Sequence, residues 1–400
     1  MERVQLIVEY MDEEIEPAIF DRAVLKYRLP IINAYVLEVP LDYVKQLRLN
    51  KSIKAVYETT GITTQMNVAR RIVEADSPEL KSYTGRGVNI AILDTGLSYC
   101  EDFTNPRNRL IAFKDFVNGR SDFYDDHGHG THVAGIACGN GFLSGRKYAG
   151  IAVGSNIIGI KVLDEDGLGN SADVLAGLQW VYDNKDLYNI RIVNMSVGTP
   201  DIGSVDPLVR AVEKIWDSGI VVVVAAGNNG PEQSSVTSPG ISRKVITVGA
   251  YDSVGASDAM GARDYDLKAV AISGERHVDF SGRGPTSECI VKPDVLAPGT
   301  NIVSCLSSGM GSKNLAAHKE HIVGRKYLSL SGTSMSTPIV SGAIALLLEK
   351  YPRLAPDDVK YALKKSAVDI NQHRDKQGWG LINIRQLIDM EVEYVRAKNI

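Results

Sequence analysis

Short apolar runs alternate with amphipathic stretches between residues 88 and 248. The apolar runs cover residues 88–93, 157–162, 192–195, 220–226 and 245–248. Runs of this length are typical of strands buried on both faces of a sheet. The stretches at 171–182 and 206–217 have the periodicity of helices. This alternation predicts an α/β domain with a mostly parallel sheet and helices on each side.

The first 62 residues have a different pattern. Strand signals at 4–10, 31–39 and 53–57 are separated by an amphipathic stretch at about 14–27 and a short helical signal near 41–49. Such a series predicts a small α+β domain of the ferredoxin-like kind. A second start signal, Tyr-Thr-Gly-Arg-Gly, stands at 83–87. We therefore expect a small domain over 1–62, a linker over 63–82 and a large domain over 83–400.

Composition and charge exclude several classes of partner. The chain has 400 residues, 44% of them hydrophobic and 23% charged, which suits a globular protein with one large and one small domain. A net charge of -4 gives no electrostatic footprint for nucleic acid or an anionic membrane. No stretch approaches the roughly 18 uninterrupted apolar residues of a membrane helix. We expect neither nucleic acid nor membrane as a partner.

The expected compartment is the cytoplasm. The first twenty residues alternate apolar and acidic positions and lack the basic and apolar regions of a signal peptide. The cysteines at 100, 138, 289 and 305 lie far apart in a chain large enough to fold without disulfides. A reduced state is the simpler interpretation.

Three separated motifs each carry one member of a hydrolytic triad. They are Asp-Thr-Gly at 94–96, His-Gly-Thr-His-Val-Ala-Gly at 129–135 and Gly-Thr-Ser-Met-Ser-Thr-Pro at 332–338. A serine hydroxyl is a weak nucleophile, so a base must accept its proton and return it to the leaving amine. Ser334 opens a predicted helix at 336–348, whose N-terminus favours developing negative charge, with Pro338 tolerated in its first turn. The three motifs together predict hydrolysis by serine.

A metal cluster is the rival interpretation of the second motif. His127, His129 and His132 lie within six residues. Zinc sites on helices usually have a His-x-x-x-His pair with a nearby acid, and that pattern is absent here. We instead expect His132 to be buried and hydrogen-bonded on a helix, and His127 to be exposed in a loop.

The order Asp, His, Ser resembles that of subtilisin-like serine proteases, the subtilases, and differs from the chymotrypsin and α/β-hydrolase orders. The resemblance covers nearly the whole chain. It implies a subtilisin-like three-layer fold in which Asp94 orients His129, and His129 acts as general base for Ser334. The segment Val-Ala-Ala-Gly-Asn-Asn-Gly at 224–230 is similar to the one that supplies a side chain to the oxyanion hole. Asn228 would fill that role with the backbone amide of Ser334.

The same resemblance implies a substrate groove. Two edge segments would pair with an extended peptide, and small residues would wall the first side-chain pocket, with Thr237 near its base. The edge segments are Gly167, Leu168 and Gly169, and Ser196, Val197 and Gly198; the second wall is Ala225, Ala226 and Gly227. The absence of charge predicts tolerance for apolar or medium-sized side chains rather than an Arg-only specificity. The segments 280–285 and 292–299 match subtilase segments that scaffold the serine.

The small leading domain resembles a subtilase propeptide. This implies that residues 1–62 act as a chaperone and inhibitor whose tail adds a strand in the groove, with a processing junction near 59–66 and the mature enzyme starting in the linker. An ordinary N-terminal extension that packs on the enzyme is the alternative. The predicted function is a serine endopeptidase made as a self-inhibited zymogen, with a peptide or protein substrate. A catalytically silent subtilase-fold module that binds a partner peptide in the groove is the other hypothesis.

Several features depart from the family pattern. The loop at 139–148, where many subtilases bind calcium, has no carboxylate and two cations, although calcium prefers six to eight oxygens. We expect no cofactor for the chemistry and leave a structural calcium ion open. Acidic groups at Asp122, Asp125 and Asp126 and at 164–166 could bind a cation, but such clusters are more often solvated. Ser336 replaces the usual Ala.

Two stretches, 253–276 and 307–326, are longer than in a minimal subtilase. A surface insertion is the default interpretation. A role of the second stretch in substrate choice or in retention of the propeptide is the alternative, because it leads into the serine motif and could overhang the groove.

Overall fold

The computed structural model describes residues 3–11, 22–58, 61–62, 70–199, 206–251 and 280–391. Within these ranges seven strands form a sheet in the order β13-β12-β11-β10-β6-β8-β7, with every neighbouring pair parallel. The strands are β6 (Asn89–Asp94), β7 (Leu110–Asp115), β8 (Asn156–Lys161), β10 (Ile190–Met195), β11 (Val221–Ala225), β12 (Ile246–Tyr251) and β13 (Val295–Pro298). The five strands expected from the apolar runs are therefore confirmed.

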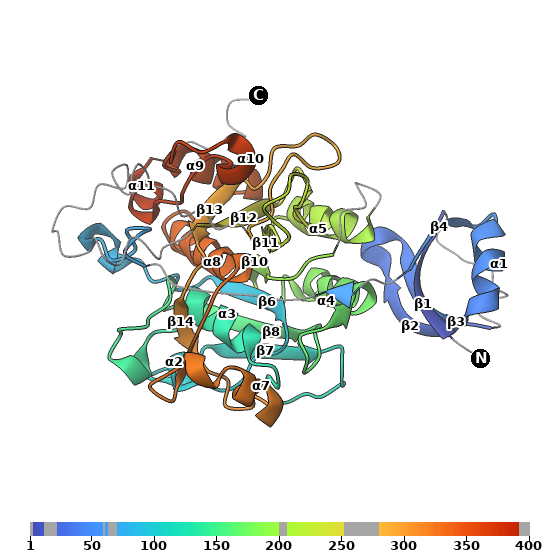
Figure 1. Ribbon diagram of the computed structural model, residues 1–400, viewed down its shortest axis with the longest axis horizontal. Coiled ribbons are helices and arrows are strands. Elements are labelled where there is room, and N and C mark those ends of the chain that lie inside the picture. The colour runs from blue at the N-terminus through green and yellow to red at the C-terminus, as the bar shows by residue number, and fades with distance from the viewer. Residues whose placement is uncertain are drawn as a thin grey trace.

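Helices cover both faces of this sheet (Figure 1). The helix α3 (His129–Cys138) packs with α8 (Thr333–Lys350), and α4 (Ser171–Asn184) packs with α5 (Pro207–Asp217). The expected three-layer α/β architecture is confirmed. Near the C-terminus α9 (Pro356–Ser366) and α11 (Ile384–Asp389) pack on each other, and α11 also contacts α8. Short elements of this domain include α2 (Glu101–Thr104), η4 (Pro78–Ser82), η5 (Phe142–Ser144) and α10 (Arg374–Gln377).

Burial explains why the sheet strands are apolar along their whole length. All six residues of β6 and all five of β11 are buried. A strand covered by helices on both faces has no exposed side, so the usual alternation of polar and apolar residues is lost. The same arrangement places the carboxyl ends of β6, β10 and β11 at one edge of the sheet, where sites form in this class of fold.

A second, four-stranded antiparallel sheet forms near the N-terminus, in the order β2-β3-β1-β4. Its strands are β1 (Arg3–Tyr10), β2 (Val24–Leu29), β3 (Ala34–Pro40) and β4 (Ile53–Glu58), with η2 (Pro30–Ile32), η3 (Leu41–Tyr43) and α1 (Val44–Leu49) between them. This strand order is that of the ferredoxin-like arrangement. The face under α1 has a small apolar core: Leu6, Val8, Leu37, Val39, Leu47 and Ile53.

One expectation for this domain is wrong. The amphipathic stretch at 14–27 was expected to be a helix, but Val24–Leu29 is strand β2, paired with β3. Residues 12–21 lie outside the described part of the chain. The pattern of polar and apolar residues in β2 is compatible with a helix and with a strand. The edge of β3 offers backbone hydrogen bonds, and these stabilise the strand.

The N-terminal sheet packs against α4 and α5 of the large domain, at the right of Figure 1. The Tyr27 hydroxyl donates to Asp173 Oδ1 at 2.7 Å and contacts the carbonyl oxygen of Phe116 at 3.0 Å. The backbone N–H of Ile31 donates to Gln179 Oε1 at 2.8 Å. Asp173 and Gln179 both belong to α4, so these contacts fix the orientation of the small domain on that helix.

A buried carboxylate adds an ion pair to this interface. Glu9 on β1 has 3% of its side chain exposed, and it pairs with Lys54 at 2.7 Å and with Arg210 on α5. A buried charge is tolerated only when it is paired and hydrogen-bonded. Separation of the two domains would leave Glu9 without its partner on α5.

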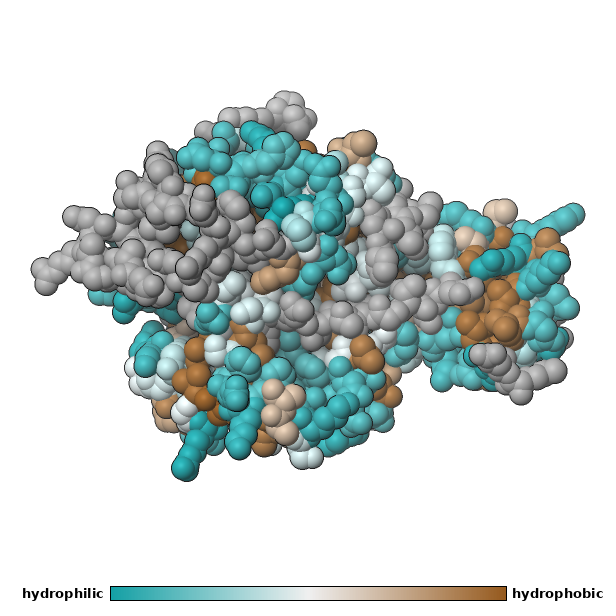
Figure 2. Space-filling model, in the orientation of Figure 1, coloured by the Kyte–Doolittle hydropathy of each residue, from teal (hydrophilic) through white to brown (hydrophobic). Residues whose placement is uncertain are grey.

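The surface is mostly hydrophilic where the structure describes it, with hydrophobic surface gathered on the N-terminal domain (Figure 2). Large apolar side chains exposed on that domain include Val24, Leu41 and Leu49. Among the described residues, no helix is long and apolar enough to span a bilayer. The four cysteines form no disulfide, and Cys289 alone among them is exposed.

Candidate active site

Asp94 and His129 meet at the edge of the sheet. Asp94 is the last residue of β6, and His129 is the first residue of α3. His129 Nδ1 lies 2.5 Å from Asp94 Oδ1, and both side chains are buried. The backbone N–H of Thr95 donates to the same carboxylate oxygen at 2.7 Å. Because a carboxylate oxygen accepts, the bond leaves His129 Nε2 as the proton acceptor of the neutral ring.

Ser334 lies in the first turn of α8 and is 2% exposed. Its hydroxyl donates to the carbonyl oxygen of Ser196 at 3.2 Å, and the Ser196 hydroxyl donates to the carbonyl oxygen of Ser334 at 2.9 Å. Pro338 was expected in the first turn, and this is wrong because α8 already begins at Thr333. Proline has no N–H for the Ser334 carbonyl four residues earlier, and the Ser196 hydroxyl supplies that donor.

Asn228 is held in a fixed orientation beside this turn. Its Oδ1 accepts from the backbone N–H of Thr333 at 3.0 Å and from the Thr333 hydroxyl at 3.2 Å. An amide has one oxygen and one nitrogen end, so binding the oxygen leaves the NH2 group as a donor for another acceptor. The neighbouring Gly227 has φ 90°, a value that favours glycine. The turn after β11 thus brings Asn228 to the start of α8.

Segment 292–299 supports the serine turn, as the resemblance implied. The N–H of Gly332 donates to the carbonyl oxygen of Gly299 at 2.7 Å. The Ser336 hydroxyl contacts the carbonyl oxygens of Ala297 at 2.8 Å and Pro298 at 3.1 Å. The hydroxyl that distinguishes Ser336 from alanine is therefore satisfied although the residue is buried.

One predicted edge segment of the groove carries a strand. The short strand β5 (Gly61–Ile62), which follows the N-terminal sheet, pairs antiparallel with β9 (Gly169–Asn170). Gly61 lies opposite Asn170, and Ile62 lies opposite Gly169. The backbone edge of β9 therefore pairs with another strand of the same chain. The expected processing junction at 59–66 lies for the most part outside the described residues.

The predicted pocket residues come together around Thr237. A Cβ added at Gly198 would collide with the Thr237 hydroxyl, and one added at Gly227 would lie 2.6 Å from Thr237 Cγ2. The N–H of Thr237 also donates to the carbonyl oxygen of Ala226 at 2.9 Å. Thr237 therefore lies between the two segments that were expected to form the walls, where any larger residue at Gly198 or Gly227 would clash.

The other two histidines of the second motif differ in environment. His132 is fully buried, its Nε2 lies 2.8 Å from the carbonyl oxygen of Leu328, and burial holds its pKa well below the usual value. His127 was expected to be exposed, but it is half-buried, and burial lowers its pKa. Its ring centroid is 6.2 Å from that of His129, and a Cβ added at Gly167 would lie 2.8 Å from its Nε2. The loop that contains Gly167 covers it, which the local sequence did not indicate.

The acidic clusters are engaged within the protein. Asp122 pairs with Arg120 at 2.7 Å, and Asp126 pairs with the buried Lys161 at 2.7 Å. Asp125 is fully buried, so the expectation of a solvated cluster is wrong for this residue. Among the described residues, no group of three or more His, Cys, Asp or Glu side chains is arranged to hold a metal ion.

The stretch 307–326 connects two loops near the site. It contains α7 (Ser312–Ala317), η6 (Lys319–His321) and β15 (Ile322–Val323), and a small sheet joins β15 to β16 (Tyr327–Leu330) and β14 (Ile302–Cys305). The N–H of Gly311 donates to the carbonyl oxygen of Asp126 at 2.8 Å, and Asn314 Nδ2 donates to that of Glu165 at 2.6 Å. The insertion thus bridges the loop before α3 and the loop before β9. The other long stretch, 253–276, lies outside the described residues.

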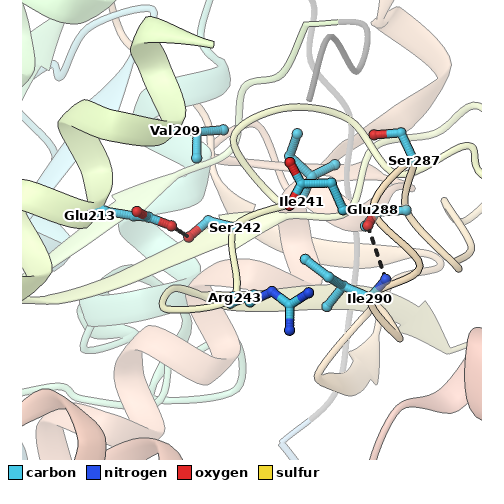
Figure 3. Close-up of a pocket in the computed structure, with 9 residues that line it drawn as sticks. Val209, Glu213, Ile241, Ser242, Arg243, Ser287, Glu288 and Ile290 are labelled. Atoms are coloured by element: carbon cyan, nitrogen blue, oxygen red, sulfur yellow. Dashed lines mark hydrogen bonds between the residues drawn. The ribbon is translucent and has the colours of Figure 1, made fainter. Parts of the chain in front are cut away.

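A small pocket elsewhere does not belong to this site (Figure 3). It has a volume of about 40 Å³ and lies between α5 and the loops at 241–243 and 286–290. The Ser242 hydroxyl donates to Glu213 Oε1 at 2.7 Å across it. Ligand pockets usually measure about 300–1,000 Å³, so this one is too small for a substrate.

The chain belongs to the subtilase family, whose characteristic sequence it matches over residues 85–380. It is a subtilisin-like serine endopeptidase. It is 41% identical to the serine protease AprX of Bacillus subtilis, over 86% of this chain and 76% of that protein. It is also 32% identical to subtilisin DY of Bacillus licheniformis, over 78% of this chain and 95% of the relative. Pyrolysin of Pyrococcus furiosus is 31% identical, over 76% of this chain but 26% of that longer protein.

Proposed function

We propose that Ser334 is the nucleophile, His129 the general base and Asp94 the residue that orients the imidazole. The carrying observation is the 2.5 Å contact between His129 Nδ1 and Asp94 Oδ1, in a buried dyad whose Nε2 is left as the acceptor. His129 takes the Ser334 proton as Oγ bonds to the carbonyl carbon, then returns it to the leaving amine as the C–N bond breaks. Water then repeats the sequence on the acyl-enzyme and releases the acid.

The oxyanion that forms in each step would bind Asn228 and the backbone N–H of Ser334. Support comes from the two hydrogen bonds that hold Asn228 Oδ1 against Thr333 and leave its NH2 group as a donor. A donor fixed before the reaction costs no reorganisation when charge develops, which makes this contribution large. No cofactor takes part in this mechanism.

The extended substrate would run antiparallel to β9, with the side chain before the scissile bond directed toward Thr237. The pairing of β5 with β9 supports this direction, because it demonstrates that the β9 backbone accepts a strand. The residues around Thr237, with glycine at 198 and 227, are small and uncharged, which favours an uncharged side chain of moderate size. A peptide or protein with apolar residues at this position is the expected substrate.

We further propose that the chain is a zymogen inhibited by residues 1–62. Two contacts support it: the N-terminal domain packs on α4 and α5, and the strand β5 that follows it pairs with β9. An extension that only packed on the enzyme would not need the second contact. A cytoplasmic location stays a prediction of the sequence, to be tested by fractionating cells that produce the full chain.

The test compares the full-length wild type with Ser334→Ala. A chain of 43.4 kDa over 400 residues averages about 109 Da per residue, so removal of a domain of this size lowers the mass by roughly 6–7 kDa. We expect this loss in the wild type only, and labelling by a fluorophosphonate in the wild type only. If both chains stay intact and the wild type is labelled, self-processing is rejected and the assignment as an active protease is retained. A processed wild type that resists the label would favour the silent peptide-binding module.

A further inference from the structure

Asp125 is a fully buried carboxylate that the proposed chemistry does not use. It precedes α3 by a few residues, in the loop between β7 and His129. In the described part of the chain no Lys or Arg forms an ion pair with it. A buried carboxylate without a cation is costly unless hydrogen bonds replace its hydration. A buried carboxylate next to the candidate active site therefore suggests a function for Asp125.

Four hydrogen bonds converge on this carboxylate. Its Oδ1 accepts from the Thr95 hydroxyl at 2.8 Å and from the N–H of Gly128 at 2.7 Å. Its Oδ2 accepts from the N–H of Thr131 at 2.8 Å and from the Thr131 hydroxyl at 2.7 Å. The two amides belong to the first turn of α3 and the residue before it, where N–H groups have no acceptor within the helix. The carboxylate thus fixes the start of the helix that carries His129.

Thr95 connects this carboxylate to the segment that carries Asp94. While its hydroxyl donates to Asp125, the same oxygen accepts from the N–H of Gly130 at 2.9 Å. Thr95 directly follows Asp94, and Gly130 directly follows His129. The bond from Gly130 to Thr95 therefore runs alongside the contact between the two side chains. By accepting the hydrogen bond of the Thr95 hydroxyl, Asp125 leaves a lone pair of the Thr95 oxygen directed at the Gly130 N–H.

We propose that Asp125 is a positioning residue for the Asp94–His129 dyad, acting through Thr95 and the first turn of α3. This inference rests on the catalytic roles proposed above. A contact of 2.5 Å between His129 Nδ1 and Asp94 Oδ1 requires strand end and helix start to be held in fixed register. Misplacement of a catalytic group by about 1 Å costs on the order of 10²-fold in rate. The carboxylate supplies that register without touching substrate.

The decisive variants are Thr95→Val and Thr95→Ser. Valine has the shape of threonine but neither accepts from Gly130 nor donates to Asp125, whereas serine keeps both bonds. We expect Thr95→Val to lower kcat about tenfold or more with little change in KM, and Thr95→Ser to retain most of the wild-type kcat. Rescue by serine separates a role of the hydroxyl from simple filling of space.

Asp125→Asn tests the carboxylate itself, and Asp115→Asn is its matched control. The amide of asparagine would turn a donor toward N–H and O–H groups, so two of the four bonds are lost. Asp115 is also buried and accepts four bonds, from the N–H groups of Val117, Asn118 and Arg120 and from the Tyr124 hydroxyl, but it does not join the two catalytic segments. The pair is therefore matched in burial and in lost bonds.

Each variant is made as the full chain and compared in peptide hydrolysis per titrated active site, with thermal unfolding measured alongside. We expect kcat to fall about 10²-fold in Asp125→Asn and to stay within about threefold of wild type in Asp115→Asn, at similar losses of thermal stability. Equal kcat in the two, or a Thr95→Val enzyme as active as Thr95→Ser, would overturn the inference. An inactive wild type would instead reject the proposed function. If Asp125→Asn does not fold, the Thr95 pair decides alone.

Discussion

Replacement of Asn228 by leucine should lower kcat by a factor of about 10²–10³, because one of the two proposed oxyanion donors is lost. This factor corresponds to roughly 2.7–4 kcal/mol of transition-state stabilisation. The oxyanion exists only in the transition state and the tetrahedral intermediate, so KM should change by less than about threefold. The assay is hydrolysis of a chromogenic peptide, with rates divided by the concentration of titrated active sites.

The structure adds a second, separable effect of this substitution. Asn228 Oδ1 also accepts the N–H of Thr333 at 3.0 Å, and leucine leaves that donor without its partner at the start of α8. An unsatisfied buried donor costs about 1–3 kcal/mol of stability. Asn228→Asp keeps an acceptor for Thr333 but loses the donor, so it should lose as much kcat as leucine or more while unfolding at a higher temperature than the leucine variant.

These two variants define the refuting result. A leucine or aspartate enzyme with wild-type kcat would mean that Asn228 does not contact the oxyanion. A rise in KM at unchanged kcat would assign it to substrate binding in the ground state. A loss of kcat in the leucine variant alone would assign the effect to the lost support of Thr333, since aspartate retains that bond.

Three further outcomes are expected. Tyr27→Phe loses a hydrogen bond to the Asp173 carboxylate, worth about 1.5–3 kcal/mol, so the released N-terminal domain should inhibit the processed enzyme at least about tenfold more weakly. A Cβ at Gly198 would collide with the Thr237 hydroxyl, so Gly198→Ala should displace Thr237 at the base of the proposed pocket and lower kcat/KM for large apolar residues before the scissile bond by about 10–200-fold relative to alanine at that substrate position. Equal losses for both substrates would contradict the pocket assignment. Because the pKa of His132 is lowered in the folded state, the unfolded chain binds the extra proton below about pH 6.5. As the pH decreases below this value, the free energy of unfolding should therefore decrease by up to about 1.4 kcal/mol per pH unit. His132→Gln, which keeps a donor for Leu328, should show a flatter dependence in urea titrations at pH 5 and 7.

The sequence alone determined the sheet, the order of the motifs and the candidate triad. Strands buried on both faces must be apolar throughout, so the runs at β6 and β11 were visible without coordinates. Asp94, His129 and Ser334 stand in local motifs whose turn and helix-start chemistry is short-range. Asn228 was identified from the resemblance of segment 224–230 to the subtilase segment that supplies a side chain to the oxyanion hole.

Only the tertiary structure decided the features that depend on contacts across the chain. Strand β2 replaced an expected helix because β3 offered an edge, and His127 is half-buried because a loop forty residues further along the chain covers it. From the sequence, Asp125 could not be distinguished from its acidic neighbours, because its hydrogen-bond donors come from segments both before and after it. Local periodicity and motif chemistry indicate what a segment can form, but burial and hydrogen-bond partners are set by segments that come together only on folding.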